Sequence, residues 1–237
     1  MKATPVVSVA LVGPDGVGKT TIARRLERTL PVRVKYIYMG DNAGASNIAL
    51  PTTRLFQMAR HARGTDVNDG GPPRLPTHTP GHRSVLQSIV SGLVWLNHQI
   101  AEEWFRQVVA WWYECRGTVV LFDRHFFCDY YAHEIERGVS TRSIKQRIHG
   151  FMLDHLFPKP DLVVFLDAPS GVLFSRKAEG TLQDLERRRQ EYPRLRAFVR
   201  RFETVDATQA ESDVATQVGR FILDLHANKA ASVARSQ

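Results

Sequence analysis

The segment Gly13-Pro14-Asp15-Gly16-Val17-Gly18-Lys19-Thr20 fits the pattern G-x-x-x-x-G-K-[ST] and constrains the fold of the chain more than any other feature. A β-branched apolar run precedes it, and an amphipathic stretch follows it. This order predicts a buried strand, a phosphate-binding loop (P-loop) and a helix. Backbone N–H groups and the helix N-terminus would bind an anion there. The expected phosphate-binding residues are Gly13, Asp15, Gly16, Val17, Gly18, Lys19, Thr20 and Thr21.

Strands and helices alternate along the rest of the chain. Apolar runs predict strands at 6–12, 32–39, 118–122 and 161–166, with a short fifth strand at 204–206. Helical spacing predicts helices at 19–30, 52–61, 84–115 and 140–156, through most of 170–202, and at 214–226. This order predicts an α/β fold, with a parallel five-stranded sheet and helices on both faces. We expect a single domain over 1–228 with a loop insert at 64–82, and a flexible tail over 229–237.

Composition narrows the class of protein. The chain has 237 residues and a net charge of +8, which favours anionic ligands of any kind. Its two cysteines suit a reducing cytoplasm. We expect no signal peptide before Gly13. Residues 84–101 contain no Asp, Glu, Lys or Arg, but they hold too many polar side chains, His98 among them, for a membrane span, so none is expected.

The third predicted strand ends in Asp123-Arg124-His125, which separates this chain from other P-loop classes. Asn-Lys occurs once, at Asn228-Lys229, and Ala-Ala follows it, so the guanine-reading motif of GTPases is absent. Motor ATPases often end this strand with an acidic pair, whereas Arg follows the Asp here. An Arg at this position suits a second phosphate-bearing ligand or a transferring phosphoryl group.

Three features together resemble the thymidylate kinase family of P-loop nucleotide kinases. They are the P-loop ending Lys19-Thr20-Thr21, the Asp123-Arg124-His125 strand end, and the strand at 160–167 before an Arg-rich segment. The resemblance implies a three-layer P-loop kinase fold with a helical lid at 176–190. It also implies ATP and Mg²⁺ as cofactors, and dimerisation through the long helix is common in the family.

The resemblance assigns roles to individual residues. Lys19 would hold the β- and γ-phosphates, while Thr20 and Asp123 would bind Mg²⁺. Asp15 would face the acceptor sugar, and Arg124 would bind the acceptor or transferring phosphate. Because the P-loop has no arginine of its own, a lid arginine would have to neutralise the transferring group; Arg176 is our candidate.

The acceptor site departs from the family pattern. Where the family has an acceptor-binding Arg on the long helix, this chain has Glu102. Asp41 follows the second strand and is a candidate base for a hydroxyl acceptor. Arg54 and Arg83 could hold an acceptor phosphate. His125 is expected to shape the acceptor pocket.

These observations leave three functional hypotheses. The first is an ATP-dependent phosphotransferase acting on a small phosphate acceptor, with a (deoxy)nucleoside monophosphate such as dTMP as the best candidate. The second is a kinase for a hydroxyl acceptor, with Asp41 as base. The third is a non-catalytic ATP switch that binds nucleic acid or a protein. The basic residues gather in the lid with few aromatic residues among them, which disfavours nucleic acid.

Overall fold

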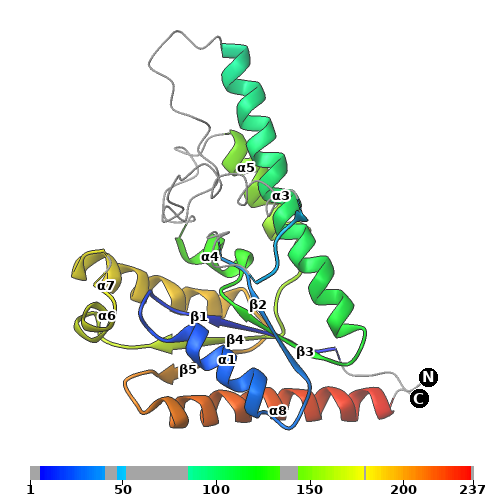
Figure 1. Ribbon diagram of the computed structural model, residues 1–237, viewed down its shortest axis with the longest axis vertical. Coiled ribbons are helices and arrows are strands. Elements are labelled where there is room, and N and C mark those ends of the chain that lie inside the picture. Colours follow the sequence, from blue (N-terminus) through cyan, green and yellow to red (C-terminus); the bar gives the residue numbers. More distant parts are fainter. Residues whose placement is uncertain (1–5, 41–46, 52–84, 134–143, 179, 236–237) are drawn as a thin grey trace.

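A parallel five-stranded sheet organises the structure (Figure 1), which is a computed structural model describing residues 6–40, 47–51, 85–133, 144–178 and 180–235. The strands are β1 (Ser8–Val12), β2 (Val34–Tyr38), β3 (Val119–Asp123), β4 (Leu162–Asp167) and β5 (Phe202–Asp206). Their order across the sheet is β2-β3-β1-β4-β5, and every neighbouring pair is parallel. The predicted α/β fold is therefore confirmed.

Helices cover both faces of the sheet because residues along each strand alternate in direction. On one face, Val9 and Leu11 pack with α1 (Lys19–Thr29) and α8 (Glu211–Arg235). On the other face, Ala10 and Val12 pack with α3 (Val85–Glu114), α4 (Phe126–His133) and α5 (Ile144–His155). All five residues of β3 are buried, as expected for a central parallel strand.

Short helices connect β4 to β5. They are α6 (Ser170–Arg176), α7 (Leu182–Glu191) and the 3₁₀ helix η3 (Tyr192–Ala197). The Thr181 hydroxyl caps α7 by accepting a hydrogen bond from the Asp184 N–H at 3.1 Å. Helix α7 and η3 both pack against α4, so the predicted lid segment lies beside the residues that follow β3.

The structure differs from the sequence prediction at two places near the C-terminus. Strand β5 begins at Phe202, where a helix was expected to end, and α8 extends to Arg235, where a tail was expected from residue 229. Alanines at 227, 230, 231 and 234 favour continued helix. The Lys229 ammonium also bonds the Val6 carbonyl and the Asp161 carboxylate, both at 2.6 Å. These contacts attach the last turns of α8 to the amino end of the sheet.

Several predicted features lie outside the described residues. They are the short helix at 52–61, the insert at 64–82, and the residues Asp41, Arg54 and Arg83. Within the described ranges, no helix is both long and apolar enough to cross a membrane.

The α8 contact yields a stability prediction. Lys229→Ala should lower the free energy of unfolding by about 1 kcal/mol, because a partly exposed ion pair and a hydrogen bond are lost. Urea unfolding would measure it. Arg235→Ala is the control, since Arg235 is exposed and its hydrogen bond goes to the nearby Ala231 carbonyl of the same helix. Equal stability of the Lys229 variant and the wild type would contradict the docking role of this lysine.

Candidate active site

The P-loop connects β1 to α1 at the carboxyl end of the sheet. It packs closely against the end of β4 and against α6. A Cβ on Gly13 would lie 2.6 Å from the Leu166 carbonyl oxygen, and one on Gly16 would lie 2.9 Å from that of Leu173. Both glycines have positive φ, so only glycine fits without strain. Gly18 caps α1 without a side-chain hydrogen bond. The first N–H groups of α1 are therefore available to an anion.

Lys19 lies buried at the start of α1. Its ammonium donates to the Gly13 and Pro14 carbonyls, at 2.7 and 2.9 Å. Burial, followed by the nearby Arg124 charge, lowers the pKa of Lys19 to about 8, although Asp15 and Asp123 oppose this shift. An arriving phosphate would add negative charge beside the ammonium and favour its protonated form.

Asp123 at the end of β3 meets Thr20 of the P-loop helix. The Thr20 hydroxyl donates to Asp123 Oδ2 at 2.5 Å, and the Tyr36 hydroxyl donates to the same oxygen at 3.2 Å. Burial and the Asp123 charge raise the pKa of the Tyr36 phenol, so it stays a donor. Asp123 is buried, and its Oδ1 has no hydrogen-bond partner within the described part of the chain.

This pair suits a magnesium ion. A hydroxyl and a carboxylate are hard oxygen ligands of the kind that Mg²⁺ takes beside nucleotide phosphates. The buried Asp123 Oδ1, which lacks a protein partner, gives an independent structural reason to expect a cation there. Thr20 and Asp123, the two metal ligands predicted from sequence, thus lie in contact.

Asp15, which belongs to the P-loop, forms ion pairs with two arginines. Arg124 and Arg188 donate to different oxygens of its carboxylate, Arg188 at 2.9 Å. Burial alone would raise the pKa of Asp15, but Arg124, Lys19, Arg188 and Lys177 together hold it below the ordinary value. Two guanidinium groups therefore meet at one carboxylate beside the phosphate-binding loop.

Arg124 has a strained backbone and a charged environment. Its φ is 66°, in the left-handed region that non-glycine residues rarely adopt. Burial would lower the pKa of its guanidinium, but Asp129 and Asp15 raise it above the ordinary value. Asp129 comes from α4 and was not expected from the sequence, because no motif spacing pointed to it.

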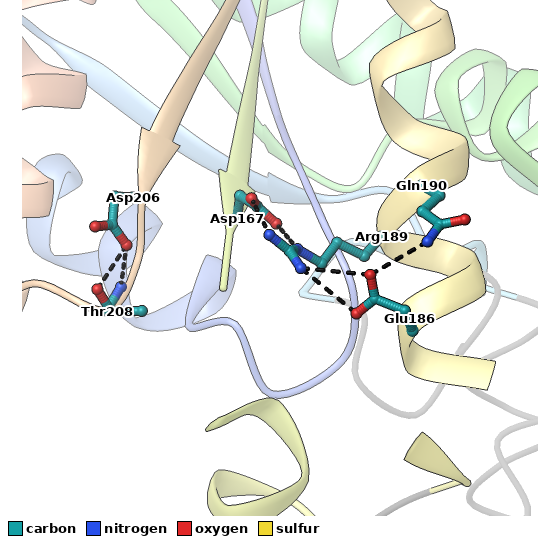
Figure 2. A network of polar contacts seen from close by, with 6 residues as sticks. All are labelled: Asp167, Glu186, Arg189, Gln190, Asp206 and Thr208. Carbon is teal, nitrogen blue, oxygen red and sulfur yellow. Dashed lines mark hydrogen bonds and ion pairs between the residues drawn. The ribbon is translucent and has the colours of Figure 1, made fainter. Parts of the chain in front are cut away.

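The structure separates the roles of the lid arginines. Arg176 donates to the Ala207 carbonyl at 3.0 Å, beside the loop that follows β5. Figure 2 shows Arg189 of α7 facing Asp167 at the end of β4, with two hydrogen bonds of 2.5 and 3.0 Å. Arg188, also on α7, pairs with Asp15 of the P-loop beside Arg124. Arg176, the lid arginine that we predicted to neutralise the transferring group, thus bonds the loop that follows β5.

A separate contact in Figure 2 joins Asp206 and Thr208, just after β5. Asp206 Oδ1 accepts from the Thr208 backbone N–H at 2.9 Å and from its hydroxyl at 2.7 Å. These bonds lower the pKa of Asp206 and hold the turn on which Arg176 rests.

Glu102 has a role that the sequence did not reveal. Its Oε1 accepts from Arg106 at 3.1 Å, and its Oε2 accepts from the Leu50 N–H at 3.1 Å. Arg106 in turn donates to the Gly40 carbonyl at 2.9 Å. Gly40 lies against Arg124, since a Cβ on Gly40 would be 2.6 Å from Arg124 Cδ. The family has a guanidinium at the position of Glu102. Here Arg106, one helical turn later on α3, supplies a guanidinium close to that position.

His125 is a core residue, which corrects the expected role in the acceptor pocket. It is 1% exposed and packs edge-on against the rings of Phe122 and Phe157. Burial lowers its pKa to about 3, so the ring is neutral. The imidazole follows Arg124 directly and lies against these two rings.

Comparison with known proteins gives a partial match to a kinase. No known family model matches the chain. Over 112 residues it is 31% identical to a protein of Saccharolobus solfataricus described as "Probable thymidylate kinase 1". The match covers 45% of this chain and 55% of the relative, so the chain spans about half the length of that relative. This distant similarity suggests a thymidylate kinase-like or other P-loop kinase family.

The position of Lys19 predicts a pH dependence of phosphate binding. ATP affinity in the absence of metal should fall by about tenfold from pH ~7.5 to ~9.5, because the free ammonium loses its proton near pH 8. Isothermal titration calorimetry would measure the affinity. Lys19→Arg should bind with a flatter profile, since guanidinium stays charged. An equally steep fall in Lys19→Met would contradict the assignment to this lysine.

Proposed function

We propose that the chain is an ATP- and Mg²⁺-dependent phosphotransferase that transfers the γ-phosphoryl group to a small acceptor, best a (deoxy)nucleoside monophosphate such as dTMP. The observation that carries the proposal is the contact between the Thr20 hydroxyl and the buried Asp123 carboxylate. It joins a P-loop to a hard-oxygen metal site at the carboxyl edge of a parallel sheet, where ligands of such sheets bind. The partial match to a thymidylate kinase supports the same class.

The residues around the P-loop suit phosphoryl transfer, which requires positioning and charge neutralisation. Lys19 and the start of α1 would hold the β- and γ-phosphates, and Thr20 and Asp123 would hold the magnesium ion. That ion would neutralise charge on the phosphates. Arg124 and Arg188 would stabilise the phosphoryl group as its bond to ADP breaks and its bond to the acceptor oxygen forms.

A monophosphate acceptor is favoured by Arg106. This guanidinium is buried at 2% exposure, held by Glu102, and lies beside Gly40 and therefore near Arg124. Its Nε has no hydrogen-bond partner among the residues described. A phosphate acceptor is already ionised near neutral pH and needs no base, so the proposal does not depend on Asp41.

A homodimer through α3 is part of the proposal. Val108, Trp111 and Trp112 are exposed on this helix at 53%, 39% and 50%. Neighbouring α5 exposes Ile148 and Phe151. Apolar side chains gathered in this way are typical of a surface that a partner covers. Size-exclusion chromatography with light scattering would test the mass of the particle.

Release of ADP from Mg·ATP tests the proposed function. Nucleoside monophosphates should stimulate release, and Asp123→Asn should lower kcat by about a hundredfold or more, since a charge in contact with the metal is lost. Asp224→Asn, at an exposed position on α8, is the matched control. Stimulation by unphosphorylated nucleosides or sugars alone would overturn the monophosphate proposal and direct attention to Asp41. No stimulation by any acceptor would favour a binding role.

The acceptor proposal predicts a selective effect of Arg106. Arg106→Gln should raise the KM for the monophosphate by about tenfold or more and leave the KM for ATP nearly unchanged. Arg106→Lys should restore part of the affinity because it keeps the charge. Thermal unfolding checks that the variants are folded. A parallel rise in both KM values would indicate that Arg106 only supports the fold.

A further inference from the structure

A polar pocket lies beside the amino ends of β1 and β4. Its walls come from the residues at the start of these strands, the last two turns of α3, Lys229 of α8, and Phe122 and His125 at the end of β3. In Figure 1, α3 descends toward the side of the sheet where α8 ends. The volume is about 180 Å³. A single water needs only about 10–15 Å³ on the same measure, so the pocket admits a larger molecule. Polar lining residues include Ser8, Gln107, Glu114, Asp161 and Lys229.

Glu114 is the pocket residue whose charge has no direct partner. It is 5% exposed, and within the described residues no hydrogen bond or ion pair reaches its carboxyl group. The neighbouring charges are already engaged. Asp161 accepts from the Ser8 N–H and hydroxyl at 2.9 and 3.0 Å, and it pairs with Lys229 at 2.6 Å. A buried carboxylate without a partner is costly unless a proton or a cation neutralises it.

The other charged side chains that line the pocket have contacts of their own. Asp161 and Lys229 pair with each other. Lys159 also lines the pocket, but it is exposed and lies over the Phe127 ring at 4.7 Å. Glu114 is therefore the buried carboxylate that a bound cation could pair with. Burial and the Asp161 charge raise the pKa of Glu114 to about 7, with Lys229 opposing.

A second pocket group needs an N–H donor. Gln107 Oε1 is a buried acceptor with no hydrogen-bond partner in the described part of the chain. Trp111 and Phe122 add apolar walls. A small molecule with one positive charge and several N–H donors would neutralise Glu114 and bond the Gln107 oxygen. An anion would meet a carboxylate, and an apolar ligand would leave the Gln107 oxygen unsatisfied.

We propose that this pocket binds a small organic monocation, a primary amine or an amidinium, through the Glu114 carboxylate. The site differs in residues and in ligand charge from the P-loop site, and it does not depend on the proposed phosphoryl transfer. A kinase assay and a cation-binding assay can therefore fail separately.

Binding of acetamidinium, with acetamide as its neutral isostere, tests the proposal by calorimetry on the full chain. Acetamidinium should bind at pH ~8 and acetamide should not. Glu114→Gln should weaken acetamidinium by at least about tenfold, because a charge-assisted bond becomes a neutral one. Asp224→Asn, an exposed carboxylate on α8, should leave binding unchanged.

The affinity should also rise between pH ~6 and ~8 and then level off, since the cation binds the ionised carboxyl group. Glu114→Gln should remove that pH dependence. Equal binding of acetamide, unchanged binding in the Glu114 variant, or no binding of either probe would each overturn the proposal. The last result would mean that the pocket holds water alone.

Discussion

The parallel pairing of β1 with β3 is the constraint on which the site depends. Leu11 of β1 pairs in register with Asp123 of β3. The Asp123 carboxylate therefore lies beside the P-loop, which begins at Gly13, two residues after Leu11. A shift of β3 by one residue relative to β1 would turn the Asp123 side chain to the other face of the sheet. The hydrogen bond from Thr20 then follows from the direction of the first turn of α1. Thr20 and Asp123, the two proposed metal ligands, come from distant parts of the sequence and meet because two strands share one register.

The sequence predicted the parts of the site that depend on local patterns. The P-loop, the strand end at Asp123-Arg124 and the long helix all follow from spacing of residues close in the chain. It did not distinguish Arg176 from Arg188 and Arg189, because all three lie on short helices whose relative directions depend on tertiary packing. Glu102 was expected to leave a gap at the acceptor site. Its partner Arg106, one turn later, became recognisable only through the contact with Gly40.

The cationic groups around the P-loop are each held by oxygen atoms of the protein. Asp15 holds Arg124 and Arg188 together, and the carbonyls of Gly13 and Pro14 hold Lys19. Groups that are already oriented need little rearrangement when negative charge arrives, which is the basis of electrostatic preorganisation. Under the proposed function, this arrangement would serve the phosphates of the nucleotide.

The left-handed backbone at Arg124 has a consequence for how sequences of this fold can change. A side chain at φ 66° costs about 1–2 kcal/mol relative to glycine. Glycine at this position would relax the backbone and remove the guanidinium that meets Asp15. The backbone strain and the ion pair with Asp15 therefore act in opposite directions on the stability at one residue. A substitution that relieves the strain at position 124 also takes a guanidinium away from the partly buried Asp15 carboxylate.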